Sequence, residues 1–214
     1  MVYTCKYKSS IGDILLATDE IGLIGLWFEG QKYFANTLPD EHIPQETEIL
    51  TETIKWLDMY FSGEEPNFTP PLHPSGSSFR QAVWQILLQI PYGQTITYGE
   101  IARKIAETKN TSRMSAQAVG GAVGHNEISI IIPCHRVVGT NGSLTGYAGG
   151  IDKKISLLEL EQKKLEAENS EIVDIVRGMS IPLAELPLLF EKLKGGGALG
   201  QSVPKSDDEE KEEN

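Results

Sequence analysis

Ile130-Ile131-Ile132-Pro133-Cys134-His135-Arg136-Val137-Val138-Gly139 is the stretch that organises this chain of 214 residues. Its three isoleucines predict a buried strand, because β-branched side chains suit a pleated sheet. Pro133 predicts the end of that strand, because proline cannot donate to a ladder. Cys134 then follows the strand beside a histidine that can accept its proton and an arginine whose charge favours the thiolate. Most lone cysteines are small buried hydrophobes, but these neighbours favour a nucleophile.

The length and composition restrict the class of protein. A chain of 214 residues can bury a core and form one or two compact units. No apolar run is long enough to cross a bilayer and no signal-peptide core is present, so we expect an intracellular protein. Cys5 and Cys134 are expected to be free thiols in a reducing compartment. Cys5 and His42 lack the further ligands that zinc requires, so we expect no metal.

The net charge of −11 is distributed unevenly. Residues 1–76 carry 4 basic and 12 acidic side chains, residues 77–161 carry 8 and 6, and residues 162–214 carry 7 and 12. Only the middle segment has a positive balance, of +2, and proteins that bind phosphates normally show a basic surface. If this segment binds nucleic acid, we expect few phosphate contacts and a weak dependence of affinity on salt.

The sequence predicts an α+β fold that begins with a small sheet-and-helix domain. Short strands are predicted at residues 2–8, 13–18 and 22–28, and their short connections favour an antiparallel sheet. Thr47 is a plausible N-cap for a helix across that sheet, since apolar residues recur at helical spacing from Leu50 to Phe61. We interpret residues 1–62 as a scaffold domain and the proline-rich residues 63–76 as a linker.

Residues 77–168 predict a mostly helical domain. Ser78 and Thr97 each open a predicted capping box, for helices that end before Pro91 and at residue 107. After a linker at residues 108–111, a third helix is predicted near residues 112–124. Two short helices joined by a turn outline a helix-turn-helix, although such hairpins are often purely structural. The third helix is rich in small residues, which permit close approach to another surface or packing against a neighbouring helix.

The last part of the chain begins with a glycine-rich loop at residues 139–150, which is suited to wrapping a partner. A helix is predicted from Asp152 through Leu165. Residues 169–214 are interpreted as an extension in which Pro182 and Pro187 exclude one continuous helix, and its acidic end is predicted to be disordered.

Pro133-Cys134-His135-Arg136-Val137 resembles the active-site signature of the O6-alkylguanine-DNA alkyltransferases, also called methylated-DNA-protein cysteine methyltransferases. The resemblance is strong over residues 77–161 and weak over residues 1–76. Further matching segments are Tyr98-Gly99-Glu100-Ile101-Ala102, Gln117-Ala118-Val119-Gly120-Gly121, Asn126, Thr145-Gly146-Tyr147-Ala148-Gly149-Gly150 and Leu157-Leu158-Glu159-Leu160-Glu161.

This resemblance implies repair of DNA by a single, irreversible transfer of the alkyl group from O6-alkylguanine, and from O4-alkylthymine, to Cys134. It implies no cofactor and no metal. The expected partner is double-stranded DNA with a flipped alkylated guanine, bound by a monomer. The expected location is the cytoplasm, with the protein on the nucleoid, or the nucleus in a eukaryote.

The resemblance also assigns roles to residues. His135 takes the proton of Cys134 through a water, Glu161 orients the imidazole, and Tyr98 donates to the leaving base. Without the resemblance, Glu161 reads as a surface carboxylate and Tyr98 as a packing aromatic. The base-binding groups are the carbonyls of Cys134 and Val137, the amide of Ala148, the ring of Tyr147, and Asn126, which ties the groove-binding helix to the reactive loop. The DNA-binding residues are Ala116, Gln117, Ala118, Gly121 and Arg136.

Gln117 departs from the family pattern, in which an arginine commonly fills the gap left by the flipped base. A neutral amide contributes less electrostatically at that place.

Three other functions fit parts of the sequence. A module that binds alkylated DNA without repairing it would not need Cys134. A cysteine hydrolase could use Cys134 and His135, but it would turn over many times. A helix-turn-helix regulator would need a sequence-reading helix, which the small residues of the third helix disfavour.

Overall fold

The computed structural model describes residues 1–178, with side chains up to residue 171. Residues 1–168 form one compact unit, which contains the site, and a second unit begins at Asn169. The predicted interruption at Pro182 and Pro187 and the predicted disordered end lie outside the described residues. Within residues 1–178, no helix combines the length and the apolar content needed to cross a membrane.

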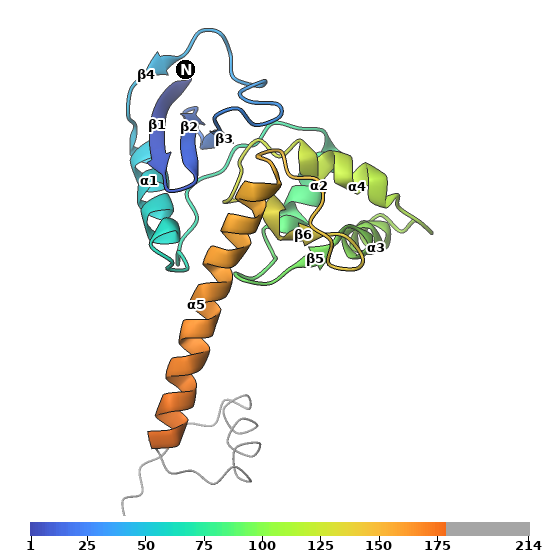
Figure 1. Ribbon diagram of the computed structural model, residues 1–214. Coiled ribbons are helices and arrows are strands. Elements are labelled where there is room, and N and C mark those ends of the chain that lie inside the picture. The colour runs from blue at the N-terminus through green and yellow to red at the C-terminus, as the bar shows by residue number, and fades with distance from the viewer. Residues whose placement is uncertain (179–214) are drawn as a thin grey trace, which may run out of the picture. The chain divides into compact units, whose positions relative to one another are not determined.

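The N-terminal sheet contains the three predicted antiparallel strands, β1 (Tyr3–Ser9), β2 (Gly12–Thr18) and β3 (Leu23–Phe28). A two-residue strand that was not predicted, β4 (Ile43–Pro44), pairs in parallel with β1, so the order is β3-β2-β1-β4. Helix α1 (Glu48–Phe61) packs against this sheet (Figure 1). The side chain of Thr47 caps it as predicted, by accepting the backbone N–H of Leu50.

The outer edge of β3 is covered by two segments from later in the chain. Leu23 pairs with residues 71–73 through hydrogen bonds of 2.7 and 2.8 Å. Leu26 donates to the carbonyl of Glu127 at 2.8 Å and accepts from the N–H of Ser129 at 3.0 Å. An uncovered edge would leave these backbone groups unpaired. The N-terminal sheet therefore holds the chain segment that leads to Cys134.

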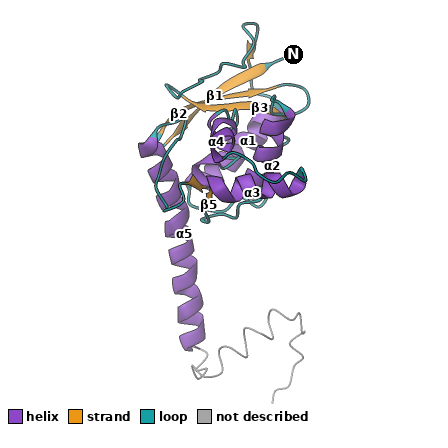
Figure 2. Ribbon diagram, turned by 90° about the vertical axis from the view of Figure 1, so that its right-hand side faces the viewer, coloured by secondary structure: helices purple, strands orange, loops and turns teal. Residues whose placement is uncertain are grey.

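The helical part contains α2 (Ser78–Leu87), β5 (Ile96–Thr97), α3 (Tyr98–Thr108), α4 (Ala116–Gly124), the 3₁₀ turn Cys134–Arg136, β6 (Val137–Val138) and α5 (Ile151–Gly178). Strands β5 and β6 pair in parallel. Helices α3 and α4 pack on one another and match the expected helix-turn-helix in outline (Figure 2).

The capping predictions had mixed outcomes. The capping box of Thr97 and Glu100 at the start of α3 is confirmed. The N-cap of α2 is Ser77 rather than Ser78, and α4 begins at Ala116 rather than near residue 112. The later start of α4 has a local cause, since the hydroxyl of Ser115 accepts the N–H of Ala118.

The strand predicted at residues 130–132 is wrong, because this segment is a buried turn. The side-chain amide of Asn126 lies 3.2 Å from the carbonyl of Ile128 and 2.8 Å from that of Ile132, which folds the chain back on itself. Ile130 adopts a φ of +69°, which is incompatible with a strand. The three isoleucines thus indicated burial correctly but not extended structure.

We predict that Gly22→Ala weakens the packing of residues 71–73 against β3. A Cβ atom at this position would lie 2.8 Å from the carbonyl oxygen of Pro71, and a backbone group cannot move aside as a flexible side chain can. The expected loss is about 1–3 kcal/mol of unfolding free energy, measured in urea. Gly121→Ala is the control that is expected not to lower the stability, because its Cβ would meet nothing within 4 Å. An unchanged stability for Gly22→Ala would contradict the prediction.

Candidate active site

Cys134 lies in the 3₁₀ turn at the start of β6 and is only 3% exposed. Its sulfur accepts a hydrogen bond from the side-chain amide of Asn126 at 3.0 Å. Burial raises the pKa of the thiol to about 11, although the Asn126 hydrogen bond and the charge of Lys154 act in the opposite direction. Cys134 is therefore a neutral thiol in the protein without DNA.

The guanidinium of Arg136 is bound by groups inside the protein. Its guanidinium donates to both oxygens of Glu161 at 3.0–3.2 Å and to the carbonyl of Ile90 at 2.7 Å, and it lies over the ring of Tyr92. The residue is 8% exposed. These internal partners engage the guanidinium in the unbound protein, and a contact between Arg136 and DNA stays a prediction.

Lys154 on α5 is the cation that favours the thiolate, and this role was not predicted from the sequence. The side chain is fully buried, and its ammonium donates to the carbonyls of Val137 and Thr145. Burial lowers the pKa of Lys154. The sequence contains an indication of this position. Lys154, Leu157 and Glu161 follow the i, i+3, i+7 spacing that places residues on one face of a helix.

Glu161 and His135 are brought together as expected. Nε2 of His135 lies 2.7 Å from Oε1 of Glu161, and both side chains are fully buried. Burial alone would raise the pKa of Glu161, but the hydrogen bonds and charges of His135 and Arg136 outweigh it and lower the pKa to about 2. The carboxylate is therefore ionised and can only accept, so Nε2 carries the proton.

The other ring nitrogen of His135 consequently holds a lone pair. Nδ1 is buried and has no hydrogen-bond partner within the described part of the chain. Burial lowers the pKa of His135, so the imidazole is neutral near pH 7. The site thus combines a neutral thiol with a neutral base whose tautomer is fixed by Glu161.

A cavity of about 600 Å³ opens next to this group. Its walls come from the start of α3, the exposed side of α4 and the glycine-rich loop, including Tyr98, Tyr147 and Ala148. The hydroxyl of Tyr98 lies 3.1 Å from the carbonyl of Thr145. Burial and the nearby Cys134 raise the pKa of both tyrosines.

Apart from Gln117, the residues of α4 that line the cavity are small. The predicted DNA-binding positions on this helix are all exposed, namely Ala116, Gln117, Ala118 and Gly121. A Cβ atom on Gly121 would meet nothing within 4 Å, so this glycine does not serve packing against a neighbouring helix. The exposed backbone of α4 instead allows a partner to approach closely.

Comparison with known proteins identifies the family. The model of the 6-O-methylguanine DNA methyltransferase DNA-binding domain matches residues 78–163, and that of its ribonuclease-like domain matches residues 1–74. A methylated-DNA–protein-cysteine methyltransferase of Methanosarcina acetivorans is 46% identical over 161 residues, covering 75% of this chain and 98% of that protein. A Haemophilus influenzae protein of the same name is 41% identical, covering 75% and 87%.

The chain belongs to the methylated-DNA–protein-cysteine methyltransferases. Solved structures agree with this assignment. The Mycobacterium tuberculosis O6-methylguanine methyltransferase is 41% identical with a TM-score of 0.65, covering 77% of this chain and 94% of that one. The structure of Mycobacterium tuberculosis OGT in complex with DNA is 40% identical with a TM-score of 0.63, covering 76% and 93%. The resemblance and the α+β fold class inferred from the sequence are confirmed. A model of a domain of unknown function also matches residues 153–213.

The two carbonyls expected to bind the base in this methyltransferase already accept internal hydrogen bonds. The carbonyl of Cys134 accepts from the N–H of Val137, and the carbonyl of Val137 accepts from Lys154. A carbonyl oxygen has two lone pairs, so each retains one acceptor site for a ligand. Lys154 thereby fixes the direction of the Val137 carbonyl.

The N-terminal part of the methyltransferase reaches the site, which the scaffold interpretation missed. Lys32 and Tyr33 line the cavity, and the N–H of Lys32 donates to the carbonyl of Ala148 at 2.9 Å. The ring of Tyr33 stacks on His125 at the end of α4, with 4.2 Å between ring centroids. Tyr60 of α1 donates to Glu161 at 2.8 Å. The sequence did not predict these contacts, because an isolated aromatic residue does not show which distant segment it will face.

We predict that Arg136→Met destabilises the fold, because it leaves the buried charge of Glu161 without its cation. The expected loss is about 3–5 kcal/mol in urea unfolding at pH 7. In the wild type the lowered pKa of Glu161 contributes stability above pH 4.5, and this contribution is lost as the pH falls toward 2. The loss in Arg136→Met is expected to begin at a higher pH.

Lys6→Met is the matched control for that experiment. It breaks an exposed pair, in which the Lys6 ammonium lies 2.8 Å from Glu29, and is expected to leave stability nearly unchanged. Equal effects of the two substitutions would contradict the account of Arg136.

Proposed function

We propose that this protein repairs DNA by moving the alkyl group from O6 of guanine to Sγ of Cys134, once per molecule. The S–C bond forms as the C–O6 bond breaks, and the thiol proton passes through a water to Nδ1 of His135. The observation that carries the proposal is the buried, unpaired Nδ1 of an imidazole whose other nitrogen is held by Glu161. O4-alkylthymine is expected to react in the same way.

The neutral resting thiol suits this chemistry. With a pKa of about 11, Cys134 is almost entirely protonated at neutral pH and does not react with solutes that miss the pocket. Attack requires a base at the moment of reaction, and a thiolate formed in a dry site is poorly solvated and hence strongly nucleophilic. Lys154 supports the negative charge on sulfur while it develops. The leaving guanine acquires negative charge, and Tyr98 at the cavity wall is placed to donate to it.

The bound partner in this proposal is double-stranded DNA with the damaged nucleotide turned out of the stack. The target carbon is otherwise enclosed in the duplex, and flipping costs a few kcal/mol. The cavity beside α4 is the expected receptor for the base, and the exposed Gln117 is the residue that would fill the gap. One protein molecule is expected to act on each lesion as a monomer.

We predict that Cys134→Ala abolishes transfer from O6-methylguanine DNA while DNA binding and the fold are retained. The sulfur is the acceptor atom, and alanine leaves only a small gap at a buried position. Tyr98→Phe is expected to slow transfer without stopping it. Single-turnover kinetics and mass spectrometry of the protein measure both effects. More than one product per protein molecule would favour a cysteine hydrolase, and an unmodified wild-type protein would favour a module that only binds damaged DNA.

We predict opposite effects of Gly121→Ala on stability and on DNA binding. Alanine at this exposed helical position is expected to stabilise the free protein by about 0.5–1 kcal/mol. The added methyl group would stand on the surface that approaches DNA, so affinity for a duplex is expected to fall. Urea unfolding and fluorescence anisotropy measure the two quantities. Unchanged affinity would show that α4 does not contact the DNA closely.

A further inference from the structure

One contact to the His135–Glu161 pair comes from the N-terminal part of the chain. Tyr60 of α1 is fully buried, and its hydroxyl donates to Oε1 of Glu161 at 2.8 Å. The same hydroxyl lies 3.4 Å from Nε2 of His135, and the two rings meet edge-on with 6.4 Å between centroids. Tyr60 thus touches both members of the pair from a helix that packs on the N-terminal sheet.

Tyr60 and His135 compete for a single oxygen atom. Oε1 of Glu161 lies within 2.8 Å of the Tyr60 hydroxyl and within 2.7 Å of the His135 nitrogen. Each donor withdraws negative charge from that oxygen, so each weakens the bond of the other. Burial raises the pKa of Tyr60 well above its ordinary value, and the phenol therefore stays a donor near neutral pH.

We propose that Tyr60 is a positioning residue that limits the basicity of His135, by holding part of the charge of Glu161 away from the imidazole. This inference rests on the proposed role of His135 as the base for Cys134. If the Tyr60 hydroxyl is absent, Oε1 interacts more strongly with the imidazolium form, and His135 becomes protonated at a higher pH. A protonated imidazole cannot accept the thiol proton, so transfer would slow near neutral pH.

Arg136 is a further donor to Oε1, at 3.0 and 3.2 Å, and it also donates to Oε2 at 3.0 Å; it is the same in every variant compared below. The N–H of Gly93 binds Oε2 at 3.0 Å. Lys154 on α5 and Arg136 both lower the pKa of His135 through their charge. Cys134, Tyr92 and Tyr147 are further titratable neighbours, and all three are neutral near pH 7 because burial raises their pKa values.

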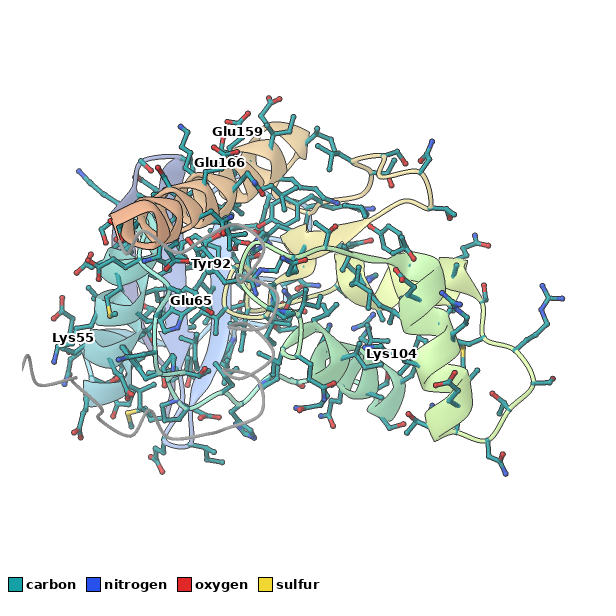
Figure 3. The ribbon with its side chains drawn as sticks, turned by 90° about the horizontal axis from the view of Figure 1, so that it is seen from below. Lys55, Glu65, Tyr92, Lys104, Glu159 and Glu166 are labelled. Atoms are coloured by element: carbon teal, nitrogen blue, oxygen red, sulfur yellow. The ribbon has the colours of Figure 1, made fainter. Side chains whose placement is uncertain are left out.

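Tyr92 offers a matched control. Its ring meets that of Tyr60 at 5.9 Å and it is 7% exposed, but its hydroxyl has no hydrogen-bond partner in the described part of the chain. Figure 3 shows Tyr92 on the inner side of α5, whereas Glu159 and Glu166 lie on the outward side. Tyr60→Phe and Tyr92→Phe therefore remove the same atom from neighbouring buried positions, and only the first removes a bond to Glu161.

The decisive experiment is the single-turnover rate of methyl transfer as a function of pH, at saturating O6-methylguanine duplex, for the wild type and both variants. For Tyr60→Phe, the acid limb of the pH–rate profile is expected to shift to higher pH by about half to one pH unit. For Tyr92→Phe it is expected to coincide with the wild type. Replacing Tyr60 with 3-fluorotyrosine, a stronger hydrogen-bond donor of similar shape, is expected to shift the acid limb to lower pH. This test remains available even if Tyr60→Phe does not fold.

The possible outcomes separate this inference from the proposed function. Coincident acid limbs for the wild type, Tyr60→Phe and the fluorinated protein would overturn the role of Tyr60 while transfer itself stands. Equal shifts in Tyr60→Phe and Tyr92→Phe would also overturn it, because they would indicate general loosening of the core. Absence of transfer in the wild type would instead refute the proposed function. A ¹⁵N titration of the His135 ring in the unreacted protein checks the direction of the shift without the reaction.

Discussion

The structure depends on one buried charge, the carboxylate of Glu161. A carboxylate removed from water is costly by several kcal/mol unless it is paired and hydrogen-bonded. The groups that compensate it come from separate parts of the chain: Tyr60 from α1, Gly93 from the turn before β5, and His135 and Arg136 from the 3₁₀ turn. Because each has to reach the same two oxygens, the charge fixes how α1, α5 and the reactive turn pack together.

The same constraint joins the two family domains into one functional unit. The N-terminal sheet accepts the segment before Cys134 along the edge of β3, and its helix α1 delivers Tyr60 to Glu161. The indole N–H of Trp27 reinforces this contact by donating to the buried side chain of Glu127 at 3.0 Å. Interpreting residues 1–62 as a mere scaffold therefore understates them, since they position both the reactive turn and the group that orients its base.

Local patterns predicted local structure well. The alternation in the first 28 residues gave three strands, and Thr47 and the Thr97–Glu100 pair marked two helix starts, because caps act within one turn. The Pro133–Val137 motif identified the family, and the carry-over of His135 and Glu161 is matched by their 2.7 Å contact. Contacts between distant segments could not be predicted from local sequence patterns. Nothing local to Arg136 says that its charge faces Glu161, and nothing local to Tyr60 says that its hydroxyl does.

The neighbours of Arg136 and Glu161 in the sequence do not indicate that the two side chains pair inside the protein. Composition suggested that a cation beside a cysteine acts on the sulfur, and that a carboxylate on a helix faces water, since charged side chains are seldom buried. In this fold Arg136 and Glu161 neutralise each other inside the protein, and Lys154 is the cation that lowers the pKa of the thiol. Burial keeps the thiol protonated at rest, and Nδ1 of the adjacent His135 has no hydrogen-bond partner within the described part of the chain. Reactivity is thereby confined to a substrate that enters the cavity, which is what a protein consumed by its own reaction requires.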